Sequence, residues 1–174
     1  MNNGMYKNAG FTLIELMITV TILGIVLGLA VPAMSDFATR QRVSGQASEL
    51  MLSLAYARSE AIKRGISISV IPKTNQTSGW ATGWCVRSDN AASCSVDGGL
   101  LKDFSSSSTV TIDSNWLATT PKLTFRRDGT VGAQHKFKVS SDKLDAARDD
   151  ARCIEISFMG RTNLNKIKKS VTCQ

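Results

Sequence analysis

The sequence predicts an α+β protein in which one long N-terminal helix packs on an antiparallel β-sheet domain. Three observations lead to this fold class. The 19 residues from Leu16 to Met34 carry no charge. A helical stripe of apolar residues then runs from Val43 to Ala61, and short segments rich in β-branched residues begin at Ile66. The chain of 174 residues, with a net charge of +7, is long enough for one such domain with a real core.

The apolar run over residues 11–34 is expected to be a transmembrane helix. As a helix it would span about 36 Å, which covers a hydrocarbon core of about 30 Å. A cleaved secretory signal peptide is the alternative, but this run exceeds the usual length of such a peptide's apolar region. Residues 1–10 form a polar leader that carries only Lys7, which is expected on the cytoplasmic side. A carboxylate inside an apolar helix is costly, so Glu15 is a functional candidate unless it simply lies near the membrane interface.

The segment Gly10–Glu15, which reads GFTLIE and leads into the apolar run, resembles the processing signature of type IV pilins and type II secretion pseudopilins. The resemblance implies that a prepilin peptidase cleaves between Gly10 and Phe11. It also implies that Phe11 becomes N-methylated and that Glu15 is the assembly carboxylate. Cleavage would create an α-ammonium group at Phe11, which is a suitable partner for the carboxylate of a packed neighbour. The helix is therefore expected to join other pilin or pseudopilin subunits.

Residues 35–65 are expected to continue the helix as an amphipathic segment that ends at Lys63-Arg64-Gly65. Within it, residues 57–61 read ARSEA, which resembles the helix of the GspH/FimT branch of the pilin-like proteins. Arg58 and Glu60 in this segment are two residues apart and are not expected to face each other. The apolar stripe consists of Val43, Ala47, Leu50, Leu54, Ala57 and Ala61, and the polar side is expected to carry Arg42, Gln46, Glu49, Ser53 and Glu60.

Residues 66–174 are expected to form the β-rich domain. Asp128-Gly129 predicts a β-hairpin that joins the strand before it to the strand at 136–139. The FRRDG element at 125–129 and the Gly160-Arg161 pair also resemble the GspH/FimT domain. The expected strands cover residues 66–72 (half-buried), 80–86, 100–104, 109–112, 123–127, 136–139 and, as the last strand, 153–159.

If the leader lies inside the cell, residues 36–174 lie in a periplasm that permits disulfides. The four cysteines allow three pairings. We favour Cys85–Cys94, which closes a short loop, and Cys153–Cys173, which would fasten the C-terminal tail to the last strand. A metal site is the alternative, but the sequence has neither CxxC nor HxxxH spacing, so no metal and no cofactor are expected. His135 is expected to face solvent.

The sequence has no GxSxG, HExxH or P-loop motif, and the protein is not expected to be an enzyme. The favoured function is that of a minor pilin that takes part in the assembly or initiation of a type IV pilus. A minor pseudopilin of a type II secretion system is the alternative. Either protein would be a single-pass protein of the bacterial inner membrane, with its C-terminal domain in the periplasm, until it enters a pilus or pseudopilus.

A second hypothesis is that the C-terminal tail binds double-stranded DNA for uptake in natural transformation. Residues 156–174 carry four cations and no acid, and such cations bind phosphates without reading sequence. The FimT-type minor pilins that the chain resembles carry a GRxR element that contacts DNA. Here Gly160-Arg161 matches its beginning, and Asn163 replaces its second arginine. A solubilising charged surface is the alternative. The candidate DNA contacts are Arg161, Lys166, Lys168 and Lys169.

Overall fold

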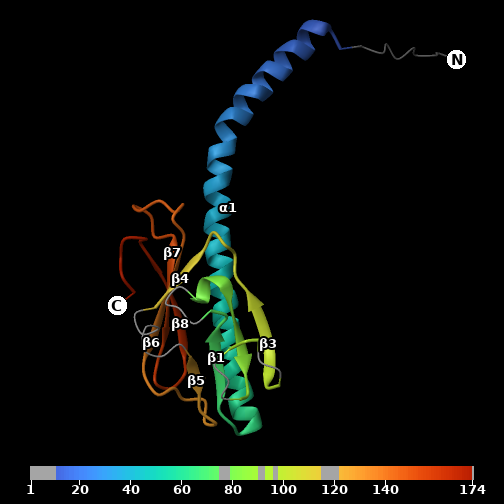
Figure 1. Ribbon diagram of the computed structural model, residues 1–174. Helices are drawn as coiled ribbons and strands as arrows, with labels where there is room; N and C mark the ends of the chain where they lie inside the picture. Colours follow the sequence, from blue (N-terminus) through green and yellow to red (C-terminus); the bar gives the residue numbers. More distant parts are fainter. Residues whose placement is uncertain (1–10, 75–78, 90–92, 96–97, 115–121, 174) are drawn as a thin grey trace, which may run out of the picture. The chain divides into compact units, whose positions relative to one another are not determined.

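Helix α1, Leu13–Arg64, runs through both segments in which a helix is expected (Figure 1). The chain divides into two units, residues 1–37 and residues 38–174, and each is described here by itself. The expected leader, residues 1–10, lies outside the described residues. The structure is a computed structural model that describes residues 11–74, 79–89, 93–95, 98–114 and 122–173.

The C-terminal end of α1 confirms the prediction. Lys63 and Arg64 occupy the last turn, and Gly65 follows with a φ of 67°, a left-handed conformation that favours glycine. The Gly65 N–H donates to the Ala61 carbonyl oxygen across 3.0 Å. All six residues of the predicted apolar stripe are fully buried. The helix therefore supplies one side of the core of the second unit.

Within the described residues, the second unit holds two four-stranded antiparallel sheets. Sheet A has the order β3-β2-β1-β5, and sheet B has the order β4-β6-β7-β8. The apolar stripe of α1 and both sheets contribute to one core cluster. The elements after α1 are β1 (Ile68–Pro72), the 3-10 helix η1 (Gly79–Thr82), β2 (Gly83–Arg87), β3 (Leu100–Ser105), β4 (Thr111–Asp113), β5 (Leu123–Phe125), β6 (His135–Ser140), β7 (Ala151–Ile156) and β8 (Thr162–Ile167).

Two expectations about the first strands are wrong in detail. Strand β1 is buried on both faces rather than half-buried. Its Val70 belongs to the core, and Ile71, on the opposite face, has its carbonyl oxygen beside Cys94 of the loop that follows β2. The strand expected at 80–86 begins with η1, which places Trp80 edge-on to Phe137 of β6, with ring centroids 4.8 Å apart. An aromatic contact thus connects η1, which directly precedes β2 of sheet A, with sheet B.

The predicted hairpin after β5 is also wrong. Its turn forms, because the Arg126 N–H donates to the Thr130 carbonyl oxygen across 2.8 Å and Gly129 has a φ of 77°. Beyond the single bridge from Phe125 to Val131, however, the chain leaves sheet A. Strand β6 then pairs with β4 and β7 in sheet B. The sequence predicted the turn correctly, but long-range packing decided which strands pair with β6.

Three residues expected on the polar side of α1 are buried. Ser53 is fully buried, and Gln46 and Glu60 are nearly so. Gln46 Oε1 accepts a hydrogen bond from the Ser107 N–H across 3.0 Å, and Glu60 forms an ion pair with Arg64. The second unit therefore covers more of the helix than the apolar stripe, and each of these side chains has a polar partner there.

Candidate functional site

Helix α1 begins with a capping arrangement that includes Glu15. Thr12 precedes the helix, and its Oγ1 accepts a hydrogen bond from the Glu15 N–H across 3.2 Å. The Leu16 N–H donates to the Thr12 carbonyl oxygen, also across 3.2 Å. Thr-x-x-Glu is a capping-box pattern, and the helix dipole favours a carboxylate in the first turn. This local role of Glu15 was not predicted, although the three-residue spacing of Thr12 and Glu15 in the sequence is typical of a capping box.

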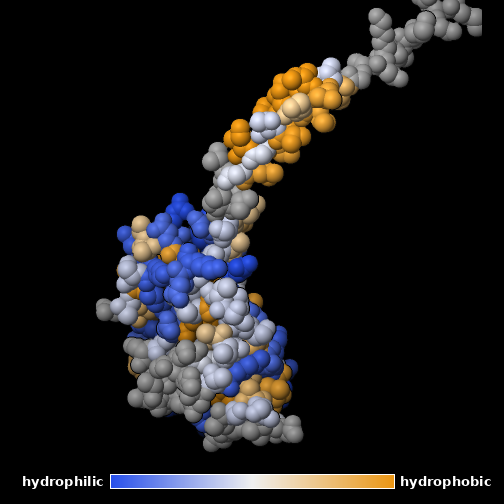
Figure 2. All heavy atoms as spheres, turned by 45° about the horizontal axis from the view of Figure 1, so that its top comes forward, coloured by the Kyte–Doolittle hydropathy of each residue, from blue (hydrophilic) through white to orange (hydrophobic). Residues whose placement is uncertain are grey.

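The large apolar side chains of residues 11–27 are exposed, and many of them are visible on the face shown in Figure 2. Phe11, the residue after the predicted cleavage point, is 81% exposed. Gly10, on the other side of that point, lies outside the described residues. A helix that is apolar all round needs a surrounding apolar phase or packed neighbours. We call these residues the apolar sheath: Phe11, Leu13, Ile14, Leu16, Met17, Ile18, Val20, Ile22, Leu23, Ile25, Val26 and Leu27.

The expected membrane span over residues 11–34 is not confirmed by the structure. Among the helices in the described part of the chain, none is both long and apolar enough to cross a membrane.

The C-terminal tail is fastened by the Cys153–Cys173 disulfide as expected, but it also contains a strand that was not expected. Residues 162–167 form β8, which pairs along its whole length with β7. The strand expected to be the last, at 153–159, is therefore followed by another. Lys138 Nζ donates to the Lys169 carbonyl oxygen across 2.6 Å, and Cys173 is disulfide-bonded to Cys153. The segment after β8 is thereby fastened to sheet B.

The four predicted DNA contacts do not form one cluster. Arg161 is exposed in the turn before β8, whereas Lys166 lies near the other end of that strand, about 16 Å away at 3.3 Å per residue. Lys168 is exposed beyond it. Lys169 Nζ donates to the Asp142 carbonyl oxygen across 2.7 Å, so its charge is already engaged with the protein. Arg161 and the lysines therefore occupy opposite ends of one strand.

Arg161 instead lies on a turn that packs against the turn after β5. The Val131 N–H donates to the Phe158 carbonyl oxygen across 3.0 Å, and the two turns approach so closely that a Cβ at Gly160 would lie 2.1 Å from the Gly129 carbonyl oxygen. Arg58 of α1 donates from Nε to that same carbonyl oxygen across 3.1 Å, which is an ordinary packed role. Three segments distant in sequence meet here.

Arg126 and Arg127 join this end of the domain, and both are exposed. The FRRDG element predicts the turn, but its two arginines were not predicted as anion contacts. The turn also holds Asp128, whose Oδ1 accepts hydrogen bonds from the hydroxyl and the N–H of Thr130, across 2.7 and 3.0 Å. The hydrogen bond from the Thr130 hydroxyl is the main cause of a lowered pKa for Asp128. We call the two turns that carry Arg126, Arg127 and Arg161 the arginine turns.

Both favoured disulfides are present. Cys85 on β2 is bonded to Cys94, nine residues later, and Cys153 on β7 is bonded to Cys173. Among the described residues, no group of three or more His, Cys, Asp and Glu side chains is arranged to hold a metal ion. His135 is half-buried rather than solvent-facing, and this burial lowers its pKa.

Comparisons with known proteins agree with this architecture. The family described as type II transport protein GspH matches residues 46–160, and the prokaryotic N-terminal methylation motif matches residues 5–31. A fimbrial protein of Neisseria meningitidis serogroup B is 32% identical over 143 residues, which are 81% of this chain and 80% of that protein.

Two solved structures share the fold. The type IV minor pilin FimU of Pseudomonas aeruginosa is 26% identical, with a TM-score of 0.59 over 79% of this chain and 99% of FimU. The minor pseudopilin EpsH of the type 2 secretion system of Vibrio cholerae is 13% identical, with a TM-score of 0.51 over 72% of this chain and 97% of EpsH. Pilins and pseudopilins are structural subunits rather than enzymes. The matched methylation motif, the matched domain and the shared fold together show that the chain belongs to the GspH family of type IV pilin-like proteins.

Proposed function

We propose that the protein is a minor pilin of a type IV pilus, made as a precursor that a prepilin peptidase cleaves between Gly10 and Phe11. The mature N-terminus would be N-methylated on Phe11. The helix over residues 11–34 would hold the subunit in the inner membrane as a single-pass anchor, with residues 36–174 in the periplasm. The helix would then enter a filament beside other subunits.

The observation that carries this proposal is the apolar sheath with one carboxylate at its start. Glu15 is the only charged residue between Phe11 and Met34. The sheath is exposed in the isolated chain, and such a surface requires lipid or neighbouring helices. An α-ammonium group at Phe11 of a neighbour would neutralise Glu15 within the packed filament, where an unpaired charge is costly.

Cleavage is tested with Gly10→Val, which changes the residue before the proposed scissile bond. We expect this variant to keep the mass of the full precursor, whereas the unaltered chain loses residues 1–10. Mass spectrometry of the membrane fraction distinguishes the two forms. Gly24→Val is the control, because it places the same side chain within the apolar run, where a Cβ meets nothing within 4 Å. Normal maturation of Gly10→Val would contradict the assignment.

The assembly role of Glu15 must be separated from its capping role. Glu15→Ala removes the carboxylate and keeps the N–H that donates to Thr12, whereas Thr12→Ala removes the cap and keeps the charge. We expect Glu15→Ala to stay in the membrane and to be depleted from sheared filaments, with Thr12→Ala close to the unaltered chain. Equal depletion of both variants would assign Glu15 a capping role.

The choice of a pilus over a type II secretion pseudopilus rests on the greater likeness to FimU than to EpsH. We expect deletion of the gene to reduce the number of surface pili and to leave the export of secreted enzymes unchanged. Electron microscopy and assays of culture supernatants measure the two effects. Loss of export with normal piliation would favour the pseudopilin.

DNA binding is a second candidate function, favoured by the exposed arginine turns. If DNA binds, Arg161 should act with Arg126 and Arg127 rather than with Lys169, which donates to the Asp142 carbonyl oxygen. Each phosphate contact removed should weaken binding for all sequences and lower the salt slope by about one.

The two ends of β8 can be tested separately in this DNA-binding assay. One variant replaces Arg126, Arg127 and Arg161 by Ala, and the other replaces Lys166 and Lys168. Fluorescence titrations with duplex DNA at two salt concentrations should show the larger loss in the arginine variant. Lys73→Ala is the control, because Lys73 is paired with Asp103. Unchanged binding in both variants would leave these cations as a charged surface, and no binding by the unaltered chain would exclude the function.

A further inference from the structure

A hollow of about 410 Å³ lies on one face of sheet A, where side-chain hydroxyl groups gather. This volume lies within the range of small-molecule sites, about 300–1,000 Å³. None of the residues that line it belongs to the helix segment on which the proposed assembly function rests. The residues that line the hollow are Ile66, Ser67, Ser69, Ser88, Asp89 and Thr124.

The register of sheet A places these groups side by side. Ser69 on β1 is the partner of Arg87 on β2 and of Thr124 on β5. Residues directly opposite each other in a sheet project from the same face, so the three side chains form one row across three strands. Ser67, directly before the strand, also lines the hollow. Val70, which points the other way, belongs to the core.

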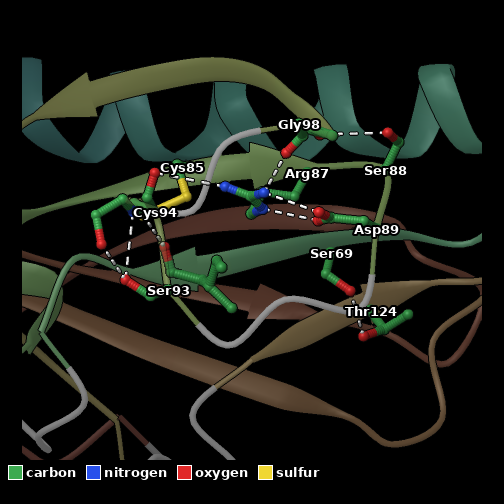
Figure 3. Close-up of polar contacts among 12 residues, drawn as sticks. Ser69, Cys85, Arg87, Ser88, Asp89, Ser93, Cys94, Gly98 and Thr124 are labelled. Carbon is green, nitrogen blue, oxygen red and sulfur yellow. Dashed lines mark hydrogen bonds and ion pairs between the residues drawn. A yellow bond between two sulfur atoms is a disulfide. The ribbon is translucent and has the colours of Figure 1, made fainter.

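The hydroxyl groups of Ser69 and Thr124 are hydrogen-bonded to each other, with 3.0 Å between their oxygens (Figure 3). Either can be the donor. Whichever donates, the proton of the acceptor hydroxyl remains for a third group. Ser69 is 4% exposed, so Thr124, which is partly exposed, presents this pair to a ligand. Thr124 can donate to a ligand oxygen when Ser69 donates to it, and it can accept from a ligand hydroxyl when it donates to Ser69. That versatility suits a ligand that carries hydroxyl groups of its own.

Asp89 adds an acceptor that is held in a defined orientation. Its two carboxylate oxygens accept from Nε and Nη2 of Arg87 across 2.7 and 2.8 Å (Figure 3). Arg87 is fully buried, and its guanidinium also donates to the carbonyl oxygens of Gly98 and Cys94. The Asp89 side chain is 37% exposed, so solvent reaches the carboxylate. A fixed carboxylate beside hydroxyl groups is a preorganised site for donors.

The charges of this site favour a neutral ligand. The Asp89 carboxylate disfavours a phosphate or carboxylate ligand, and the adjacent Arg87 guanidinium disfavours a metal ion or an amine. Ile66 is 42% exposed and offers an apolar wall beside the polar groups. A sugar has neighbouring hydroxyl groups to donate and accept, together with C–H groups that pack on such a wall. We propose that this hollow is a binding site for a neutral saccharide.

The proposal is tested by NMR titration of the full chain in micelles of a detergent without a sugar headgroup. The probes are D-glucose, D-galactose and N-acetyl-D-glucosamine, each raised to about 100 mM, because an open polar site of this size should bind with a Kd of millimolar order. We expect saturable shifts of the amide signals of Ser67, Ser69, Asp89 and Thr124 with at least one sugar. The absence of saturable shifts with all three sugars would overturn the proposal.

A double variant identifies the hydroxyl row as the site. Ser69→Ala with Thr124→Val removes both hydroxyl groups together, so neither is left without its partner. We expect this variant to keep its fold, as judged by its remaining amide signals, and to bind the sugar about tenfold more weakly. Asp103→Asn, on the exposed pair with Lys73, is the matched control and should bind as the unaltered chain does.

Two further outcomes would overturn the proposal. One is equal sugar affinity in the double variant and the control. The other is saturation of the same amide signals by inorganic phosphate or by Ca²⁺ but not by the sugars, which would show that the site selects a charged ligand.

Discussion

Trp84 on β2 donates its indole N–H to the Ser53 hydroxyl on α1 across 2.8 Å, and both side chains are fully buried. Ser53 Oγ donates in turn to the Leu50 carbonyl oxygen across 2.7 Å. The ring of Trp84 stacks on Phe104 of β3, with centroids 5.8 Å apart. A polar residue inside the helix–sheet interface thus fixes the position of a large aromatic side chain.

Ser53→Ala should lower the free energy of unfolding by about 1–3 kcal/mol, because it leaves the buried indole N–H of Trp84 without its acceptor. The matched control is Ser48→Ala on the exposed side of α1. The Ser48 hydroxyl donates to the Ser44 carbonyl oxygen of the same helix. That change should stay within about 0.5 kcal/mol. Urea unfolding followed by tryptophan fluorescence measures both variants. Equal midpoints would refute the role assigned to Ser53.

Gly160→Ala should separate the two arginine-bearing turns. Gly160 has a φ of 70°, and a Cβ there would lie 2.1 Å from the Gly129 carbonyl oxygen. Gly65→Ala is the control, because Gly65 has a φ of 67° and open space around the added Cβ. It isolates the backbone strain, about 1–2 kcal/mol, from the clash. Thermal unfolding should show a clearly larger loss for Gly160→Ala, and equal losses would mean that the turns are not in tight contact.

Removing the Cys153–Cys173 disulfide should destabilise the protein more than removing Cys85–Cys94. The first bond spans 20 residues and the second spans 9, and the entropy lost by the unfolded chain grows with loop length. Arg87 also continues to hold the shorter loop through its hydrogen bond to the Cys94 carbonyl oxygen. The double serine variant of each pair, compared by thermal unfolding without reductant, measures the order. The expected cost is about 2–4 kcal/mol for the longer loop.

The half-buried His135 should make stability depend on pH in mildly acidic solution. Burial lowers the pKa of His135 below its ordinary value of about 6.5. Between the lowered pKa and about pH 6.5 the unfolded chain binds more protons than the folded chain, so stability falls as the pH is lowered through this window. Urea midpoints at about pH 7.5 and 5.5 should therefore differ, and His135→Gln should reduce the difference. An unchanged difference would contradict this assignment to the single histidine of the chain.

The sequence predicted those features that depend on local patterns. The apolar stripe from Val43 to Ala61, the helix end at Gly65 and the turn at Gly129 all appear where they are expected. Helical periodicity, glycine in a left-handed conformation and the Asp-Gly turn signal are encoded within a few residues. Cys85–Cys94 was favoured because it closes a short loop, and Cys153–Cys173 because it would fasten the C-terminal tail to the last expected strand. Both disulfides are present.

What the sequence by itself determined is therefore the long helix with its apolar stripe, its C-terminal cap at Gly65 and the β-rich class of the domain, because each depends on neighbours in the chain. Only the tertiary structure decided which strands pair, because the partner of β6 is chosen by packing across the core and not by the turn before it. It also decided that Lys166 lies on a further strand, β8, and that Lys169 donates to the Asp142 carbonyl oxygen. It placed Arg161 beside the turn of Arg126. These relationships join residues far apart in sequence, and they arise only when both sheets close on the same helix.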